Sequence, residues 1–407
     1  THAPRGDLQG SGRFSPLARA VEPNHGLAPG CWSLTTTSDF YALESVWREL
    51  STETVWPSPF HSWEFAVEWF ERFVLSRAGG ATGRFMVGVA VDEARQVIGL
   101  APMFEEHALG QRSLGLILQP FGRSHSMETM TDEPVIVLRR HAEHRALAML
   151  IGNIVGQARV ARWDVAVVPQ YAATGPSRAL VSISPRLDHV QVTRQIGSPL
   201  LLHLPDSFDA LRAEQLSKSM RDNIAYYPRR LQREQGEWRI GFATSPGDVS
   251  AATTELIDLH RARSRWAEGV RHRNHIPTQR ESGFLHRWFQ RLALRGEVQI
   301  ARLTVRGEVI AAQAFVERAG CMAVYYSGQA ERWRRYSPLT VIMAEVIRDA
   351  IARRVDRVVF PPGDDPWKTR WGATSADPVQ ETSIYSTELT ALLRGLIRRF
   401  QPKTEEQ

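Results

Sequence analysis

One order of secondary structure recurs in the two halves of this sequence, and it constrains the fold more than any other feature. In each half, a strand–turn–strand hairpin is followed by a third strand, a helix and a buried strand. The first copy covers residues 84–106, 114–122, 143–160 and 163–170, and the second covers residues 298–318, 321–328, 338–354 and 355–363. Single segments also match, since QVIGLAPMFE (96–105) parallels EVIAAQAFVE (308–317). The sequence therefore predicts two copies of one αβ unit.

The repeated unit predicts the fold class. A hairpin followed by strand, helix and strand gives a mixed, mostly antiparallel sheet flanked by helices, so we predict an α/β protein with two tandem domains. The 407 residues also exceed what one ordinary core contains. We divide the chain into a flexible leader (1–30), a first domain (31–200), a second domain (201–390) and a C-terminal tail (391–407). The leader lacks the apolar segment of a signal peptide.

Composition narrows the choice of partner and compartment. The formal net charge of +6 favours anionic partners such as phosphates, nucleic acid or acidic lipid, although arginine-rich solvated helices explain it equally. Two cysteines, Cys31 and Cys321, provide neither a disulfide framework nor a cysteine-type zinc site, which fits a reducing cytoplasm. No apolar run reaches the roughly 18 residues that a membrane-spanning helix needs.

The segment GQAERWRRYSPLT (328–340) joins the third strand of the second copy to its helix. Ser337 is suited to the N-cap of that helix, and Pro338 to its first position. Three arginines precede them: Arg332, Arg334 and Arg335. Guanidinium groups beside a helix N-terminus predict a site for a diphosphate or a 3′-phosphate. The alternative is a capped helix whose arginines are solvated.

The corresponding loop of the first copy, residues 122–143, has a different character. It carries three acidic residues that would repel phosphate: Glu128, Asp132 and Glu133. We therefore expect the second domain to bind the donor and the first domain to bind no cofactor. His141 and His144 have a spacing that can ligate a metal, but a third ligand is not evident, so we expect no metal site.

The stretch FPPGDDPWKTRWGA (360–373) ends a buried strand and at once gathers charges and indoles. Asp365 is suited to cap a short helix, which leaves Asp364 to project into a cleft beside the strand. Lys368 would pair with Asp364 or with a phosphate, and Trp367 and Trp371 would form the cleft wall and contact the substrate. The alternative is a capped helix with an exposed ion pair, which contributes little to stability.

Several residues near these segments could carry out acid–base chemistry in a group transfer, which requires a base, donors for an oxyanion and an acid for the leaving group. The candidate bases are Asp364, Glu317 at the end of a hairpin strand, and His275 in the loop 271–277. Tyr326 is the candidate acid. No His–Asp pattern accompanies Cys321, which therefore is not expected to act as a nucleophile.

A basic stretch follows the predicted domain boundary, over residues 216–234. Its cations are Lys218, Arg221, Arg229, Arg230 and Arg233. One interpretation is an amphipathic helix over the cleft between the domains, broken at Pro228, with Tyr227 near the substrate. The alternative is nucleic-acid binding, in which Tyr226 and Tyr227 stack on bases.

These motifs together resemble the acetyltransferase family called CelD/BcsL, a tandem family of the GCN5-related N-acetyltransferase (GNAT) superfamily that is related to the Fem-type transferases. The segments that carry the resemblance are PFHSWEFAVEWFERF (59–73), GLAPMFE (99–105), LSKSMRDNIAYYPRRLQRE (216–234), YYSGQAERWRRYSPLTV (325–341) and FPPGDDPWKTRWGA (360–373). Two positions depart from the family pattern: Pro228 lies in the basic helix, and Leu339 replaces a frequent glycine after Ser-Pro.

The resemblance implies a fold and an activity. A strand splays from its neighbour, the gap admits the pantetheine arm of an acyl-CoA, and the next helix start binds the phosphates. Carried over to this chain, the donor contacts are Arg332, Arg334, Arg335, Tyr336, Ser337, Pro338 and Leu339. The implied reaction is transfer from acyl-CoA, acetyl-CoA first, to an amine of a small molecule or saccharide in a biosynthetic pathway. Because Fem-type relatives use aminoacyl-tRNA, a carrier-bound donor (aminoacyl-tRNA or acyl carrier protein) is the alternative.

Overall fold

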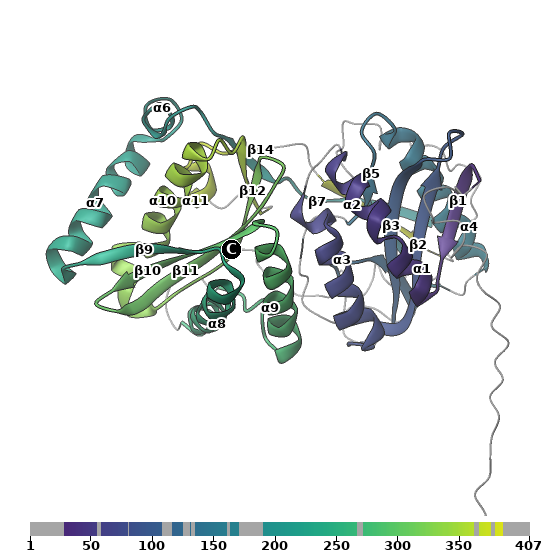
Figure 1. Ribbon diagram of the computed structural model, residues 1–407, viewed down its shortest axis with the longest axis horizontal. Coiled ribbons are helices and arrows are strands. Elements are labelled where there is room, and N and C mark those ends of the chain that lie inside the picture. The colour runs from purple at the N-terminus through teal and green to yellow at the C-terminus, as the bar shows by residue number, and fades with distance from the viewer. Residues whose placement is uncertain are drawn as a thin grey trace, which may run out of the picture.

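A computed structural model describes residues 28–54, 58–79, 81–107, 116–124, 131, 135–160, 163–170, 190–266, 272–361, 366–375 and 379–385. They form two mixed sheets flanked by helices, arranged as two lobes (Figure 1). This architecture confirms the predicted α/β fold with two tandem GNAT-like domains.

The first sheet is built mainly from the first copy of the repeat. Its strand order is β1 (Gly30–Leu34), β2 (Ala81–Val91), β3 (Val97–His107), β4 (Leu116–Pro120), β6 (Val165–Gln170), β15 (Val379–Tyr385) and β7 (Val190–Gly197), with β5 (Val137–Leu138) paired to β3. Alternate residues of β2 enter different cores: Val87 and Val89 face one side, and Met86 and Ala90 the other. The helix α4 (Glu143–Val160) packs on the Ala90 side.

The opposite face of the first sheet is covered by short helical segments rich in aromatic residues. These are α1 (Thr37–Ala42), α2 (Glu44–Thr52), the 3₁₀ turn η1 (Pro59–His61), α3 (Trp63–Trp69) and the π-helical η2 (Phe70–Leu75). Ser58 and Ser62 cap η1 and α3 through side-chain oxygens that accept backbone N–H bonds.

The second sheet has the strand order β14 (Thr374–Ser375), β8 (Leu200–His203), β13 (Arg357–Phe360), β12 (Cys321–Gln329), β11 (Glu308–Arg318), β10 (Val298–Val305) and β9 (Trp238–Ala243). One face packs against α8 (Pro246–Arg263) and α9 (Gln279–Ala293), and the other against α6 (Phe208–Glu214), α7 (Lys218–Gln235) and α10 (Pro338–Ala352). A short helix, α11 (Pro366–Thr369), follows β13.

The two sheets exchange strands. The chain leaves the first sheet at Gly197 and enters the second at Leu200, as β8 beside β13. It returns after β14, and β15 then inserts between β6 and β7 of the first sheet. The predicted second domain (201–390) thus contains a strand of the first sheet. An apolar strand pattern specifies that a strand is buried, but it does not specify which sheet the strand joins. The domain division itself stays a prediction.

The basic helix α7 corrects a second expectation. It runs without interruption from Lys218 to Gln235 with Pro228 inside it. Proline removes one backbone hydrogen bond, at a cost of about 3 kcal/mol in a helix interior. Burial of Met220, Ile224 and Leu231 in the second core offsets that cost.

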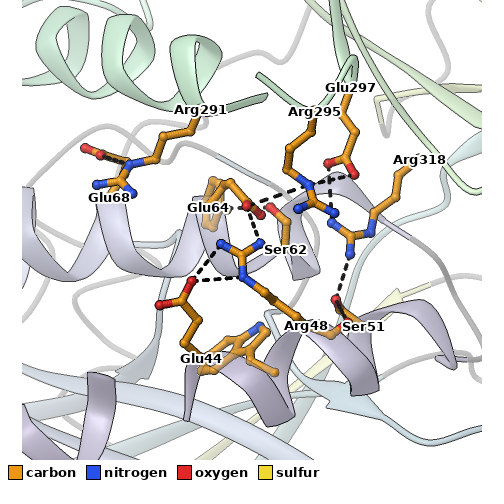
Figure 2. Close-up of polar contacts among 12 residues, drawn as sticks. Glu44, Arg48, Ser51, Ser62, Glu64, Glu68, Arg291, Arg295, Glu297 and Arg318 are labelled. Carbon is orange, nitrogen blue, oxygen red and sulfur yellow. Dashed lines mark hydrogen bonds and ion pairs between the residues drawn. The ribbon is translucent and has the colours of Figure 1, made fainter. Parts of the chain in front are cut away.

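Aromatic packing joins the two lobes. Phe65 of α3 lies edge-on to Trp288 of α9, with ring centroids 5.2 Å apart, and Phe60 lies 5.5 Å from Tyr325 of β12. Around this contact lies an ionic network (Figure 2). The buried Glu64 binds Arg48 of its own lobe and lies 3.7 Å from Arg295 of the other. A fixed interface between the lobes results.

Two further ionic contacts cross the same interface. Glu68 of α3, 1% exposed, accepts a hydrogen bond from Arg291 Nε of α9 at 2.6 Å. Arg318 at the end of β11 donates to Ser51 Oγ of α2 at 2.7 Å and to Glu297. Both contacts are drawn in Figure 2. Loss of either partner would leave a buried charge or hydroxyl without a bond.

Candidate functional site

The strands β12 and β13 separate inside the second sheet. They pair in parallel only over Cys321–Ala323 with Arg357–Val359, whereas β12 continues to Gln329. The last part of β12, residues 324–329, therefore runs on beyond its described pairing with β13. The equivalent strands of the first sheet, β4 and β6, also pair briefly, over Ile117 and Leu118.

A β-bulge shapes β12 on its other edge. Gln313 of β11 pairs with Ser327, but Phe315 pairs with Val324, so one residue of β11 opposes two of β12. Those two residues are Tyr325 and Tyr326, whose ring centroids lie 4.2 Å apart. The bulge re-aims both tyrosine side chains at the point where β12 leaves β13.

The start of α10 lies directly after this strand. Ser337 has φ 45° and ψ 55°, a left-handed conformation that most residues with a side chain avoid. Its side chain makes no capping hydrogen bond, which corrects the expectation that Ser337 caps the helix through its hydroxyl. Instead, its carbonyl accepts the N–H groups of Thr340 and Val341, and Pro338 occupies the first turn as expected. Such strained residues cluster at ligand sites.

The three arginines before this helix point to different places. Arg332 forms an ion pair with Glu308 of β11, and Arg335 donates to the hydroxyl of Tyr336 at 2.7 Å. Only Arg334 lies toward α8, with its guanidinium 5.8 Å from the ring of Trp266. The three guanidiniums are therefore not gathered around one phosphate.

Tyr336 and Leu339 are structural residues. Tyr336 is 1% exposed, and its hydroxyl accepts from Gln235 and donates to Glu234, both at the end of α7. The ring also lies 5.2 Å from Arg230 of α7. Leu339 packs against the second core. These residues hold α7 against the loop that precedes α10.

A cluster of histidines lies on the α8 side of the bulge. His260 is 1% exposed and its Nδ1 lies 3.0 Å from the Ser327 carbonyl, while its Nε2 accepts the backbone N–H of His275. Because Nε2 accepts, the ring proton is on Nδ1, and the imidazole is neutral. Burial lowers the pKa of His260 to about 4. His260 thus ties α8, β12 and the loop before α9 together.

The close contact of α8 with β12 depends on Gly328. A Cβ atom at this position would lie 2.3 Å from the His260 backbone nitrogen. The missing side chain lets the last turn of α8 rest directly on the strand.

Two more basic groups complete the cluster. Arg263, the last residue of α8, donates from Nη1 to Ser327 Oγ at 3.2 Å. Its Nε is buried and has no hydrogen-bond partner in the described part of the chain, and the same holds for His272 Nε2. Burial, followed by the charge of Arg263, lowers the pKa of His272 to about 3. Burial and Arg334 lower the pKa of Arg263.

The predicted catalytic residues fall in three places. Tyr326 and His275 come together, with rings 5.9 Å apart and nearly parallel. Glu317 lies at the opposite end of the strand pair, opposite Met322, where it forms an ion pair with Arg353. It is far from the bulge because strand residues advance about 3.3 Å each. Asp364 lies outside the described residues.

The predicted substrate residues lie mainly in the core. Trp371 is 2% exposed in the second core, and Tyr227 packs against that core. Lys368 is also 2% exposed, with Nζ 5.8 Å from the ring of Trp367. Trp367, 41% exposed and edge-on to Phe360, alone reaches solvent. Trp371 thus fills the second core, and Tyr227 is partly buried against that core.

Sequence reasoning missed His260, His272 and Arg263. A signal existed, since HRAR (260–263) and RHRNH (271–275) place two basic runs on either side of a short loop. What the sequence could not show is that the α8 end and β12 touch. Among the residues that the structure describes, no three His, Cys, Asp or Glu side chains could hold a metal, and no helix is long and apolar enough to cross a membrane.

Comparison with known proteins is consistent with this geometry. Residues 218–369 match the family model described as "Acetyltransferase (GNAT) domain". The structure titled "Crystal structure of FemX" superimposes with a TM-score of 0.58 at 9% identity, over 89% of this chain and 100% of that one. A tandem GNAT protein from the clavulanic acid biosynthesis pathway has a TM-score of 0.42 at 11% identity, over 87% and 98%. No curated protein matches in sequence.

The family match coincides with the separated strands, the bulge and the start of α10. Residues 218–369 of the second lobe thus match an acetyltransferase (GNAT) domain, which supports an N-acyltransferase enzyme. The FemX likeness supports the shared two-domain fold.

Proposed function

We propose that the protein transfers an acyl group from acyl-CoA, acetyl-CoA in the simplest case, to an amine of a small molecule or saccharide, within the second domain. The main support for this proposal is the gap where β12 separates from β13, beside Ser337 with its left-handed backbone conformation. An amide-rich arm would lie in this gap alongside β12, and the α10 start would offer N–H donors to phosphates. We also propose that the protein is an enzyme of the CelD/BcsL type and that it has a biosynthetic role in the cytoplasm.

The bulge and its neighbours supply the chemistry. His275 takes a proton from the acceptor ammonium, and the amine nitrogen then attacks the thioester carbon. Strand N–H groups beside the gap stabilise the oxyanion. The carbon–sulfur bond breaks, the acylated nitrogen releases its second proton to water, and Tyr326 donates its hydroxyl proton to the leaving thiolate. Water returns the proton from His275 to Tyr326 after product release. The stacking of the two rings supports this pairing.

Arg334 is the phosphate ligand of this proposal, because it extends from the loop before α10 toward Trp266 at the end of α8, whereas Arg332 and Arg335 extend toward Glu308 and Tyr336. Arg334→Glu should bind acetyl-CoA more weakly, so that a roughly tenfold higher acetyl-CoA concentration is needed for the same rise in melting temperature. Arg332→Glu in the same loop is the matched control and should keep the wild-type response. The proposal fails if millimolar acetyl-CoA leaves the wild-type melting temperature unchanged, or if both variants respond as the wild type does.

A carrier-bound donor, aminoacyl-tRNA or acyl carrier protein, is the second candidate. It is favoured by the outer face of α7, where Tyr226 is 48% exposed and Lys218, Arg229 and Arg233 are also exposed. A polyanionic carrier would bind there with strong salt dependence. Gel-shift binding of tRNA at 50 mM and 200 mM salt, with Arg229→Glu/Arg233→Glu as the variant, separates the two donors.

A further inference from the structure

The end of α8 contains basic groups without a compensating acid among the described residues. The charges that act on Arg263 and His272 come from Arg263 itself, Arg334, His260 and His275, and all of them are basic. Other arginines behave differently: Arg48, Arg291 and Arg353 each bind a carboxylate. A partly buried guanidinium is costly unless an anion accompanies it.

Two buried nitrogens of this group that can donate a hydrogen bond, His272 Nε2 in one of its two tautomers, have no partner within the described chain. Arg263 donates a hydrogen bond from Nη1 to Ser327 Oγ, which fixes the guanidinium. Its buried Nε has no partner within the described chain. The buried Nε2 of His272 is in the same state. The adjacent Arg261 provides the contrast, because its Nε and Nη2 donate to the carbonyls of Ile276 and Thr278. Arg261 is thus used for the loop, and Arg263 is left for a ligand.

The position of Arg263 and His272 beside the bulge indicates that their ligand is part of the acceptor substrate. Arg263 ends α8 and contacts Ser327 of β12, His272 lies in the loop before α9, and the charge of Arg334 reaches Arg263 from the loop before α10. Ser327, which Arg263 contacts, directly follows Tyr326 of the bulge. One strand residue spans about 3.3 Å, so an anion on Arg263 lies only a few bonds from an amine at the bulge.

We propose that the acceptor carries an anionic group, a carboxylate or a phosphate, close to its amine, and that Arg263 and His272 bind that group. The inference rests on the proposed acyl transfer and narrows its substrate class to short amino acids or amino sugar acids and phosphates. A neutral amine would leave the two donors unsatisfied and would bind more weakly for that reason.

Binding is tested first, without turnover. The full chain is melted in sodium phosphate, in sodium malonate and in sodium chloride at equal ionic strength. We expect the melting temperature to rise saturably with either phosphate or malonate, and the effective salt identifies the class of anion. Arg263→Gln should bind that anion roughly 10- to 100-fold more weakly. The control is Arg265→Gln, which removes an exposed charge from the same helix end and should respond as the wild type does. Equal shifts in all three salts, or an undiminished response of Arg263→Gln, would overturn the inference.

Turnover is tested second, with matched amines and acetyl-CoA, by release of the CoA thiol. Glycine and β-alanine are compared with their amides, and glucosamine 6-phosphate with glucosamine. The wild type should prefer the anionic member of a pair, and Arg263→Gln should lose that preference through KM. Equal use of both members would refute an anionic acceptor while leaving acyl transfer intact. Absence of any acetyl-CoA-induced melting shift would instead refute the donor proposal, and the anion shifts would still decide the inference.

Discussion

His260 Nδ1 lies 3.0 Å from the carbonyl oxygen of Ser327, and this single bond links the last turn of α8 to the bulged strand β12. The other ring nitrogen accepts the N–H of His275, so the imidazole also positions the proposed base. His260 contacts no proposed substrate atom and is therefore a positioning residue. Its replacement has consequences for both stability and catalysis.

His260→Ala should lower the free energy of unfolding by about 2–4 kcal/mol, since it removes two hydrogen bonds and opens a cavity. It should also lower kcat for acetyl transfer, because His275 loses its anchor. Urea denaturation and thiol release measure the two effects. His144→Ala, an exposed histidine of α4, serves as the control and should change neither. An unaltered kcat in His260→Ala would contradict the positioning role.

The pH dependence of stability should report the buried histidines. The pKa of His260 is lowered in the folded state, from 6.5 to about 4, so the unfolded chain binds protons more readily than the folded chain does. The contribution to stability is therefore fully present above pH 6.5 and is lost as the pH falls toward 4. We expect a loss of about 3 kcal/mol from His260 over that interval. Urea denaturation at pH 7, 5.5 and 4 tests this, and His260→Gln should flatten the profile.

Gly328→Ala should be strongly destabilising. The added Cβ would lie 2.3 Å from the His260 backbone nitrogen, and backbone cannot rotate away as a side chain does. A loss of at least about 3 kcal/mol is expected. Gly241→Ala on β9 is matched, because its Cβ would meet no atom within 4 Å, and it should stay within about 1 kcal/mol of the wild type. Equal unfolding midpoints in the two variants would show that α8 does not rest on β12.

Removal of β15 should unfold the first lobe, although the deleted residues are nearly 200 positions away from it in sequence. A chain that ends at Ser375 loses the strand between β6 and β7, including the buried Ile384 and Tyr385. We expect its melting temperature to lie at least about 10 °C below that of a chain ending at Tyr385. Hydrogen exchange should place the loss in β6 and β7. If β6 and β7 were still protected in the shorter chain, β15 would not be needed to complete the first sheet.

The sequence predicted the repeated unit well because each half has its own periodic signal. Strand alternation gave β10 and β11, helical spacing gave α4 and α10, and the proline after Phe360 marked the end of β13. These are local properties, and local patterns determine element type. The assignment of β15 to the first sheet is a long-range property, and it could not be predicted from the apolar letters of residues 379–385.

The site was predictable only in part. His275 and Tyr326 were predicted as candidates from two separate motifs, and the structure places their rings 5.9 Å apart, whereas their catalytic roles stay a prediction. Arg332 and Arg335 were grouped with Arg334 because they are neighbours in sequence, yet the irregular turn before α10 directs them to Glu308 and Tyr336. Trp371 was interpreted as a cleft wall, whereas an indole that follows a turn is equally suited to fill a core. Side-chain direction in loops is not encoded by spacing.

The insertion of β15 also fixes an order of events during synthesis. While the ribosome is still adding residues up to Tyr385, the edge of β6 in the nascent chain remains open. The first lobe can therefore close its sheet only after residue 385 has emerged, when the second lobe has had time to assemble. In this protein the amino-terminal half is the last to be completed.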